Sequence, residues 1–131
     1  MLLDTSGLYA FFDHGTRQHA DAVRIMASAR RRVTHNYVLA EFVASARSYG
    51  HPPEAILRFV TSLEQNPLVK VVYVDKRLHR DGIALLEHRL DKERSLCDAV
   101  SFGVIERRRL AEALTTDHHF EQAGFLRLLD P

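Results

Sequence analysis

Short apolar runs alternate along this chain with apolar residues at helical spacing. Leu2-Leu3, residues 32–34 and residues 68–74 are runs of the first kind, and two more lie at residues 112–115 and 125–129. Segments that are apolar at consecutive positions are typical of strands buried on both faces, as in a parallel sheet. The pattern therefore predicts a sheet of about five short strands.

Between these runs, apolar residues recur every three or four positions, which predicts helices. The expected helices are those at residues 7–13, 19–29 and 36–49, one opened by Pro52-Pro53, one capped by Asp75, one capped by Ser95 that runs to the arginines at 107–109, and a turn at residues 118–123. Asn36 is the predicted N-cap of the third helix. Gly50 and Gly124 are expected to end the helices that precede them.

Strands that alternate with helices are typical of an α/β protein with a parallel sheet covered on both faces. The length, 131 residues, is usual for one domain, so we expect a single domain over residues 1–131. Ligands of such sheets bind beyond the carboxyl ends of the strands. Candidate site residues are therefore those that follow a strand directly.

The composition is that of an ordinary globular protein, with 46% hydrophobic and 27% charged residues, and it excludes disordered and collagen-like classes. The single cysteine, Cys97, cannot form an internal disulfide and has no metal-binding spacing. Every apolar run is far shorter than the roughly 20 residues of a membrane helix, and no cationic segment of a signal peptide precedes Asp4. We therefore expect a cytoplasmic protein with no membrane contact.

The formal net charge is only +1, so bulk charge cannot hold a nucleic acid. Local basic clusters are present as arginine triplets at residues 30–32 and 107–109, and Arg77, Arg80 and Arg94 are further candidates for contacts with RNA phosphates. The triplet at 107–109 fits a solvated helix end equally well, because the helix dipole favours cations there.

Four carboxylates lie at positions that suggest chemistry. Asp4 follows the first strand and Asp117 follows the strand at 112–115, whereas Glu41 and Asp98 lie among apolar residues on predicted helices. If they converge, neighbours about 4 Å apart repel by roughly 4 kcal/mol per pair at an effective dielectric near 20. Such a cluster must protonate or bind a cation, and Mg²⁺ or Mn²⁺ suits oxygen ligands. Metal-assisted hydrolysis of a phosphodiester is the reaction that these ligands favour.

Taken singly, the same acids have simpler explanations. Asp4 and Asp117 precede helical turns, where aspartates commonly act as caps. Glu41 and Asp98 could face solvent or pair with an arginine such as Arg94. Only the agreement among the four positions favours a shared site.

Four short segments occur in a characteristic order and spacing. They are residues 3–6 (LDTS), 36–41 (NYVLAE), 95–102 (SLCDAVSF) and 114–120 (LTTDHHF), with Gly124-Phe125 after the last. In this arrangement the chain resembles the PIN-domain ribonucleases, in particular the VapC-type toxins of bacterial and archaeal toxin–antitoxin modules, over nearly its whole length.

The resemblance implies a three-layer α/β/α sandwich and an endoribonuclease that uses Mg²⁺ or Mn²⁺. It places the acidic site on Asp4, Glu41, Asp98 and Asp117, with the hydroxyl groups of Ser6 and Thr115 beside it. In the expected mechanism the three aspartates hold the ion, and Glu41 positions a second ion or the attacking water. The resemblance also implies an RNA substrate, a homodimer and a cognate antitoxin that masks the site.

Two departures from the family pattern remove no expected ligand. Cys97 stands where relatives often carry threonine or another small polar residue, and His118-His119 follows Asp117 where many show a mixed or acidic pair. The two histidines leave open a metal-independent ribonuclease that uses the 2′-OH of the substrate. The eight histidines of the chain show no zinc-site spacing.

Other functional classes remain as alternatives. A PIN nuclease that processes RNA without being a toxin, and a catalytically silent module that binds RNA or a partner, would share the same fold. A phospho-receiver module is disfavoured, since Asp4 is a lone acid and no lysine follows the last strand. Tyr9, Phe11 and Phe12 are expected in the core because their spacing is helical.

Overall fold

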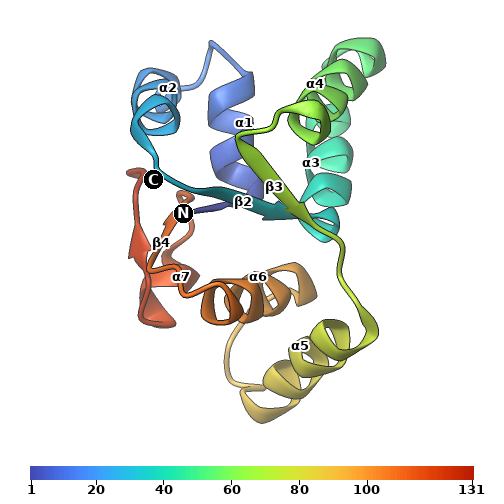
Figure 1. Ribbon diagram of the computed structural model, residues 1–131, viewed down its shortest axis with the longest axis vertical. Coiled ribbons are helices and arrows are strands. Elements are labelled where there is room, and N and C mark those ends of the chain that lie inside the picture. Colours follow the sequence, from blue (N-terminus) through green and yellow to red (C-terminus); the bar gives the residue numbers. More distant parts are fainter.

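The computed structural model describes all 131 residues and contains five strands and seven helices (Figure 1). The strands are β1 (Leu2–Leu3), β2 (Arg32–His35), β3 (Val69–Val72), β4 (Glu112–Leu114) and β5 (Leu126–Arg127). The helices are α1 (Thr5–Phe12), α2 (His19–Ser28), α3 (Asn36–Ser48), α4 (Pro53–Gln65), α5 (Lys76–His88), α6 (Leu96–Arg107) and α7 (His118–Gln122). The strands form one parallel sheet in the order β3-β2-β1-β4-β5, which confirms the predicted sheet.

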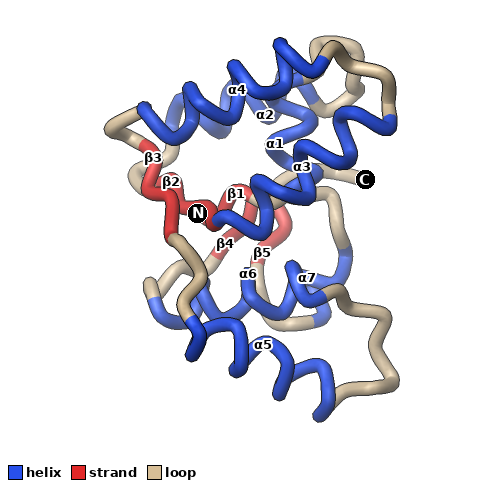
Figure 2. Tube along the Cα trace, turned by 90° about the vertical axis from the view of Figure 1, so that its right-hand side faces the viewer, coloured by secondary structure: helices blue, strands red, loops and turns tan.

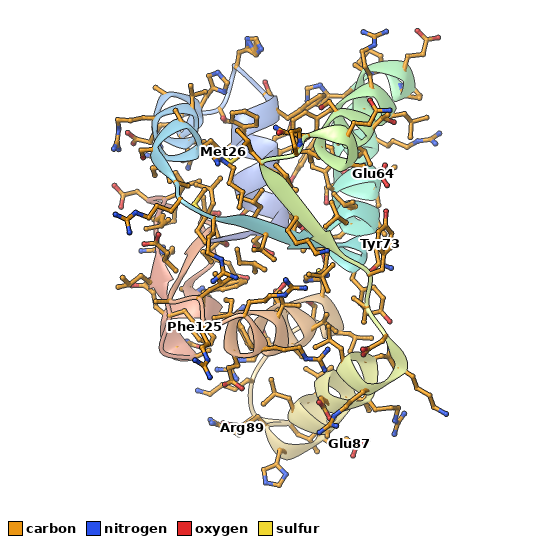
Figure 3. The ribbon with its side chains drawn as sticks, viewed as in Figure 1. Met26, Glu64, Tyr73, Glu87, Arg89 and Phe125 are labelled. Atoms are coloured by element: carbon orange, nitrogen blue, oxygen red, sulfur yellow. The ribbon has the colours of Figure 1, made fainter.

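The helices cover both faces of the sheet and give three layers. Figure 1 and Figure 2 show α1 to α4 on one face and α5 to α7 on the other. Leu3 belongs to the core cluster under the first group and Leu2 to the cluster under the second, because successive strand side chains point to opposite faces. Figure 3 shows Met26 on the side of the sheet covered by α1 to α4, and Phe125 on the side covered by α5 to α7. The expected α/β/α architecture is confirmed.

The outer strands are shorter than predicted. β3 pairs only with β2, over four residue pairs that end at His35↔Val72. Beyond that point the N–H of Val74 donates to Oδ1 of Asn36 at 2.7 Å, so the chain leaves the ladder. The prediction that Asn36 caps α3 is therefore wrong: its side chain is used by Val74, and Nδ1 of His35 accepts from the N–H of Val38 as the cap.

A close contact between α1 and β4 requires a glycine. A Cβ atom on Gly7 would lie 1.9 Å from the carbonyl oxygen of Leu114. The missing side chain therefore lets the first turn of α1 approach the end of β4. This contact places Ser6 beside the residues that follow β4.

No helix combines the length and apolar character needed to cross a membrane.

Candidate active site

A cavity of about 340 Å³ lies beyond the carboxyl ends of the central strands. Its lining includes all four predicted acids: Asp4 after β1, Glu41 on α3, Asp98 on α6 and Asp117 after β4. These elements come from both helical layers, with α3 on one side of the sheet and α6 and α7 on the other (Figure 2). The structure therefore brings the four acids together, from positions up to 113 residues apart in the sequence (117 − 4).

A hydroxyl network orients the carboxylate of Asp4. The Thr115 hydroxyl donates to Oδ2 of Asp4 at 2.8 Å, and Thr115 Oγ1 accepts from the N–H of Asp117 at 3.0 Å. Ser6 Oγ lies 3.1 Å from Thr115 Oγ1 and accepts from the N–H of Thr116. Because the one proton of Thr115 is used on Asp4, Ser6 must be the donor to Thr115. Thr115, which follows β4, thus holds the Asp4 carboxylate, and Ser6 on α1 in turn holds Thr115.

Asp98 lies in the first turn of α6 within a capping box. Its Oδ2 accepts from the N–H of Ser95 at 3.0 Å, while Ser95 Oγ accepts from the N–H of Asp98 at 3.0 Å. The predicted cap at Ser95 is confirmed. No ion pair involves Asp98 or Glu41, so neither is neutralised by an arginine.

Asp117 combines a cap with a position in the cavity. Its Oδ1 accepts from the N–H of His119 at 2.9 Å and lies 3.0 Å from Nδ1 of that residue. Glu41 contrasts with it, since this residue is exposed on α3 and its side chain forms no ion pair. Asp117 therefore both caps α7 and lines the cavity, so the two explanations of this residue are compatible.

The electrostatics of the cavity disfavour four ionised carboxylates. Burial raises the pKa of Asp4 to about 7, and the nearby charges of Asp98 and Glu41 also raise it. Burial is also the main cause that raises the pKa of Asp98, with Asp117 and Glu41 adding to the effect. Burial and three of these acids likewise raise the pKa of the Cys97 thiol, which therefore stays protonated. A bound cation would relieve the repulsion.

The residues present fit a divalent ion. Oδ1 of Asp4 is fully buried and has no hydrogen-bond partner, which is costly unless another group binds it. The other donors around it are carboxylate oxygens, the ligands that Mg²⁺ and Mn²⁺ prefer. Asp4, Asp98 and Asp117 line the cavity in which such an ion would bind, with Glu41 at its exposed side. The three side chains whose ligand atoms already lie within 4.8 Å of one another are Asp117, His118 and His119, so Asp4 and Asp98 would have to approach Asp117 to share one ion with it.

The three predicted RNA-contacting arginines lie outside this cavity. Arg77 on α5 lines a separate hollow that also contains Asp75, Asp81 and Glu106, and Arg80 lies one turn further along the helix. The Arg94 guanidinium packs 5.3 Å from the centroid of the Phe102 ring. None of the three arginines lines the cavity, and their contact with RNA stays a prediction.

Sequence reasoning missed part of the lining. Tyr9, Thr16, Ser45 and Tyr49 all line the cavity. Tyr9 was expected in the core, and its ring does pack against the core cluster, but it also borders the cavity. The four-residue spacing of Glu41, Ser45 and Tyr49, along α3 and to the residue that follows it, is the signal that could have found the last two.

Comparisons with known proteins agree with this geometry. The PIN domain family matches residues 1–126. The chain belongs to the PIN domain family. It is 29% identical over 128 residues to the 23S rRNA-specific endonuclease VapC20 of two Mycobacterium tuberculosis strains, which covers 96% of this chain and 95% of the relative. The predicted likeness to VapC-type PIN-domain toxins is confirmed.

Solved structures agree as well. The crystal structure of Mycobacterium tuberculosis VapC20, described as a sarcin-ricin loop cleaving toxin, matches with a TM-score of 0.88 and 28% identity over 98% of both chains. A toxin–antitoxin complex from Klebsiella pneumoniae matches with a TM-score of 0.68 and 18% identity, over 99% of this chain and 98% of the other, and shows the shared fold.

Proposed function

We propose that this PIN-domain protein is an endoribonuclease that hydrolyses RNA phosphodiester bonds with Mg²⁺ or Mn²⁺, and that it is the toxin of a toxin–antitoxin pair. The observation that carries the proposal is the meeting of Asp4, Glu41, Asp98 and Asp117 in one cavity, where Oδ1 of Asp4 is buried without a partner. The family and the similarity to VapC20 support the same activity.

Each acid has a distinct task in this proposal. Asp4, Asp98 and Asp117 hold the ion, and hydrogen bonds from Thr115, Ser95 and His119 orient one carboxylate oxygen of each. Glu41, exposed at the cavity, positions the attacking water or a second ion. When bound, a divalent ion lowers the pKa of water and stabilises charge on the phosphate.

Substrate and partners follow from the relatives. VapC20 is described as specific for 23S rRNA, and a structural neighbour is a toxin–antitoxin complex. We therefore propose that this chain cleaves structured RNA, for which 23S rRNA is the first substrate to test. We also propose that it assembles as a homodimer and binds a cognate antitoxin.

The test measures cleavage of 23S rRNA by the purified chain with Mg²⁺, with Mn²⁺ and with excess EDTA. We expect cleavage that EDTA abolishes, and a loss of about 100-fold or more in Asp98→Asn, because one group that stabilises the transition state is removed. Asp75→Asn is the matched control. Asp75 caps α5 outside the cavity, and asparagine caps a helix equally well, so this variant should cleave normally.

Two results would contradict the proposal. Full cleavage in EDTA would point instead to His119 acting on the substrate 2′-OH without a metal. Equal activity of Asp98→Asn and Asp75→Asn would mean that the cavity is not the catalytic site.

A further inference from the structure

The cavity extends beyond the four acids along α3. Glu41 and Ser45 lie one turn apart on α3, and Tyr49 directly follows the last residue of that helix; all three line the cavity. Eight residues of helix separate Glu41 from Tyr49 by about 12 Å. The acidic end of the cavity therefore leads to a tyrosine at the C-terminal end of the helix.

Tyr49 is an exposed aromatic residue that rests on a second tyrosine. Its side chain is 69% exposed, and its ring centroid lies 5.0 Å from that of Tyr9, with the rings tilted by 49°. The pair leaves much of the Tyr49 ring facing solvent, at the end of the cavity that lies away from the acids. Tyrosine is enriched at binding surfaces because it joins an apolar ring to a polar hydroxyl.

The lower ring of the pair is held firmly. The Tyr9 hydroxyl donates to Oδ2 of Asp13 at 2.9 Å and lies 2.8 Å from Nε2 of His51. Burial and the contact with Asp13 raise the pKa of Tyr9 to about 12, so this hydroxyl keeps its proton. The Tyr9 ring also packs against the core. Tyr49 thus rests on a support whose position is fixed before any ligand binds.

The charge of the cavity decides what kind of contact RNA can make there. Its lining contains four carboxylates and no lysine or arginine. The part of the chain that lines it therefore offers RNA phosphates no cationic side chain. Beyond what a bound ion supplies, affinity along this cavity must come from uncharged contacts, of which base stacking on an aromatic ring is the strongest available.

We propose that Tyr49, supported by Tyr9, is a stacking platform for an unpaired RNA base close to the phosphate that is cleaved. This inference rests on the proposed function and makes Tyr49 a specificity-determining residue. A flat platform favours loops and single strands over duplex, because only an unpaired base presents a free face. Thr16 and Ser45, which line the same cavity, offer hydroxyl groups to the edge of that base.

The first experiment measures binding of a fluorescein-labelled 12-nucleotide single-stranded RNA of mixed sequence by anisotropy. All proteins carry Asp98→Asn and Mg²⁺ is present, so that cleavage does not interfere. We expect Tyr49→Ala to raise Kd about 10-fold, within the roughly 5- to 150-fold range of one lost stack, and Tyr49→Phe to change it less than about twofold.

Tyr73→Ala is the matched control. Tyr73 is similarly exposed, at 65%, and directly follows β3 (Figure 3). It does not line the cavity. It should bind the RNA normally. In the parent protein with Asp98 intact, Tyr49→Ala should raise KM for cleavage and leave kcat nearly unchanged, because the ring binds the substrate without touching the reacting atoms.

The second experiment replaces each nucleotide of a cleaved RNA by an abasic one in turn. At one position near the cleaved bond, the abasic replacement should weaken binding to the protein that retains Tyr49. The same replacement should have no effect on binding to Tyr49→Ala. Equal binding by Tyr49→Ala and the parent protein would overturn the proposal, as would the absence of any such position. A change from dimer to monomer in Tyr49→Ala that accounts for the lost binding would also overturn it, since Tyr49 would then be a subunit contact.

The two proposals can fail separately. RNA binding that depends on Tyr49, with no RNA cleavage, would contradict the proposed endoribonuclease function and still support the stacking platform. Metal-dependent cleavage with no effect of Tyr49→Ala on Kd or KM would remove the platform and leave the function.

Discussion

At the scale of residues, the candidate site consists of acids that are each fixed by local hydrogen bonds and repelled by one another. Asp98 and Asp117 each accept a hydrogen bond from a backbone N–H at the start of a helix, so one carboxylate oxygen of each residue stabilises the helix end. Asp4 is held by Thr115 alone, and its second oxygen has no partner. The site therefore stores unfavourable energy that a cation can release.

The buried Asp4 carboxyl should make the stability of the metal-free protein depend on pH. Its pKa is raised to about 7 in the folded state, from an ordinary value of 3.8. The folded state therefore binds the proton more tightly, and the associated stability is present below pH 3.8 and lost as pH rises to about 7. The full effect corresponds to roughly 4 kcal/mol in the free energy of unfolding.

Urea denaturation of the wild type and of Asp4→Asn in EDTA checks this prediction. Asp4→Asn should gain stability relative to the wild type as pH rises from 4 to 8, although it loses activity. The comparison between variants is needed because His35 acts in the opposite direction: burial lowers its pKa to about 4, so its contribution is lost as pH falls. Parallel stability curves for the two proteins would refute the prediction. Mg²⁺ should stabilise the wild type at pH 8 more than the variant.

At the scale of elements, the helices that carry Glu41 and Asp98 are joined by one buried histidine. Nδ1 of His35 accepts from the N–H of Val38 at the start of α3, so its proton resides on Nε2. Nε2 then donates to Ser101 Oγ on α6 at 2.8 Å. This link fixes α3 relative to α6 across the sheet, and with it the two acids from opposite layers.

The contact of α1 with β4 gives a second prediction at this scale. Gly7→Ala should lower the free energy of unfolding by about 3 kcal/mol, because the added Cβ would overlap the Leu114 carbonyl and force the helix away from the strand. It should also reduce RNA cleavage, since Ser6 would move away from Thr115.

Gly103→Ala is the control for a helical glycine. Its Cβ would meet only the flexible end of Leu78, at 2.9 Å. We expect a change below about 1 kcal/mol, because the gain in helix propensity offsets the adjustment. Thermal or urea denaturation of both variants, together with a cleavage assay, gives the comparison. Equal destabilisation by the two substitutions would show that the close approach of α1 to β4 does not require a glycine at position 7.

At the scale of the whole molecule, opposite charges gather at opposite ends of the sheet. The four acids lie at the carboxyl ends of the strands, whereas a hollow at the amino ends is lined by Arg30, Arg31, Arg32, Lys70 and Arg108 and contains no acidic residue. None of these five cations forms an ion pair. The net charge is only +1, although positive and negative side chains are distributed unevenly between the two ends of the sheet.

This separation predicts different effects on short and long RNA. Arg30→Gln combined with Lys70→Gln should leave cleavage of a short RNA unchanged, because that RNA occupies only the acidic end. A long structured RNA can reach the basic hollow. For this RNA, the slope of log K against log salt concentration should become less steep by about 1 for each phosphate contact removed. Salt titrations of both RNAs measure this. Equal salt slopes for the double variant and the parent protein on long RNA would count against the prediction.

The sequence by itself determined the strands, the helices and their alternation, because these depend on periods of apolar residues within a few turns of chain. It also placed Asp4 and Asp117 after strands, and the parallel sheet then puts such residues at one edge. The caps at Asp75 and Ser95 were equally local and are confirmed.

Only the tertiary structure decided which helix faces meet. α6 buries eight of its 12 residues, so no polar side of the helix shows in the sequence which way Asp98 points. The absence of Arg77, Arg80 and Arg94 from the cavity lining, and the place of Tyr9 in it, likewise depend on how whole layers pack. Side chains far apart in the chain meet through the sum of many weak contacts, and no local pattern records that sum.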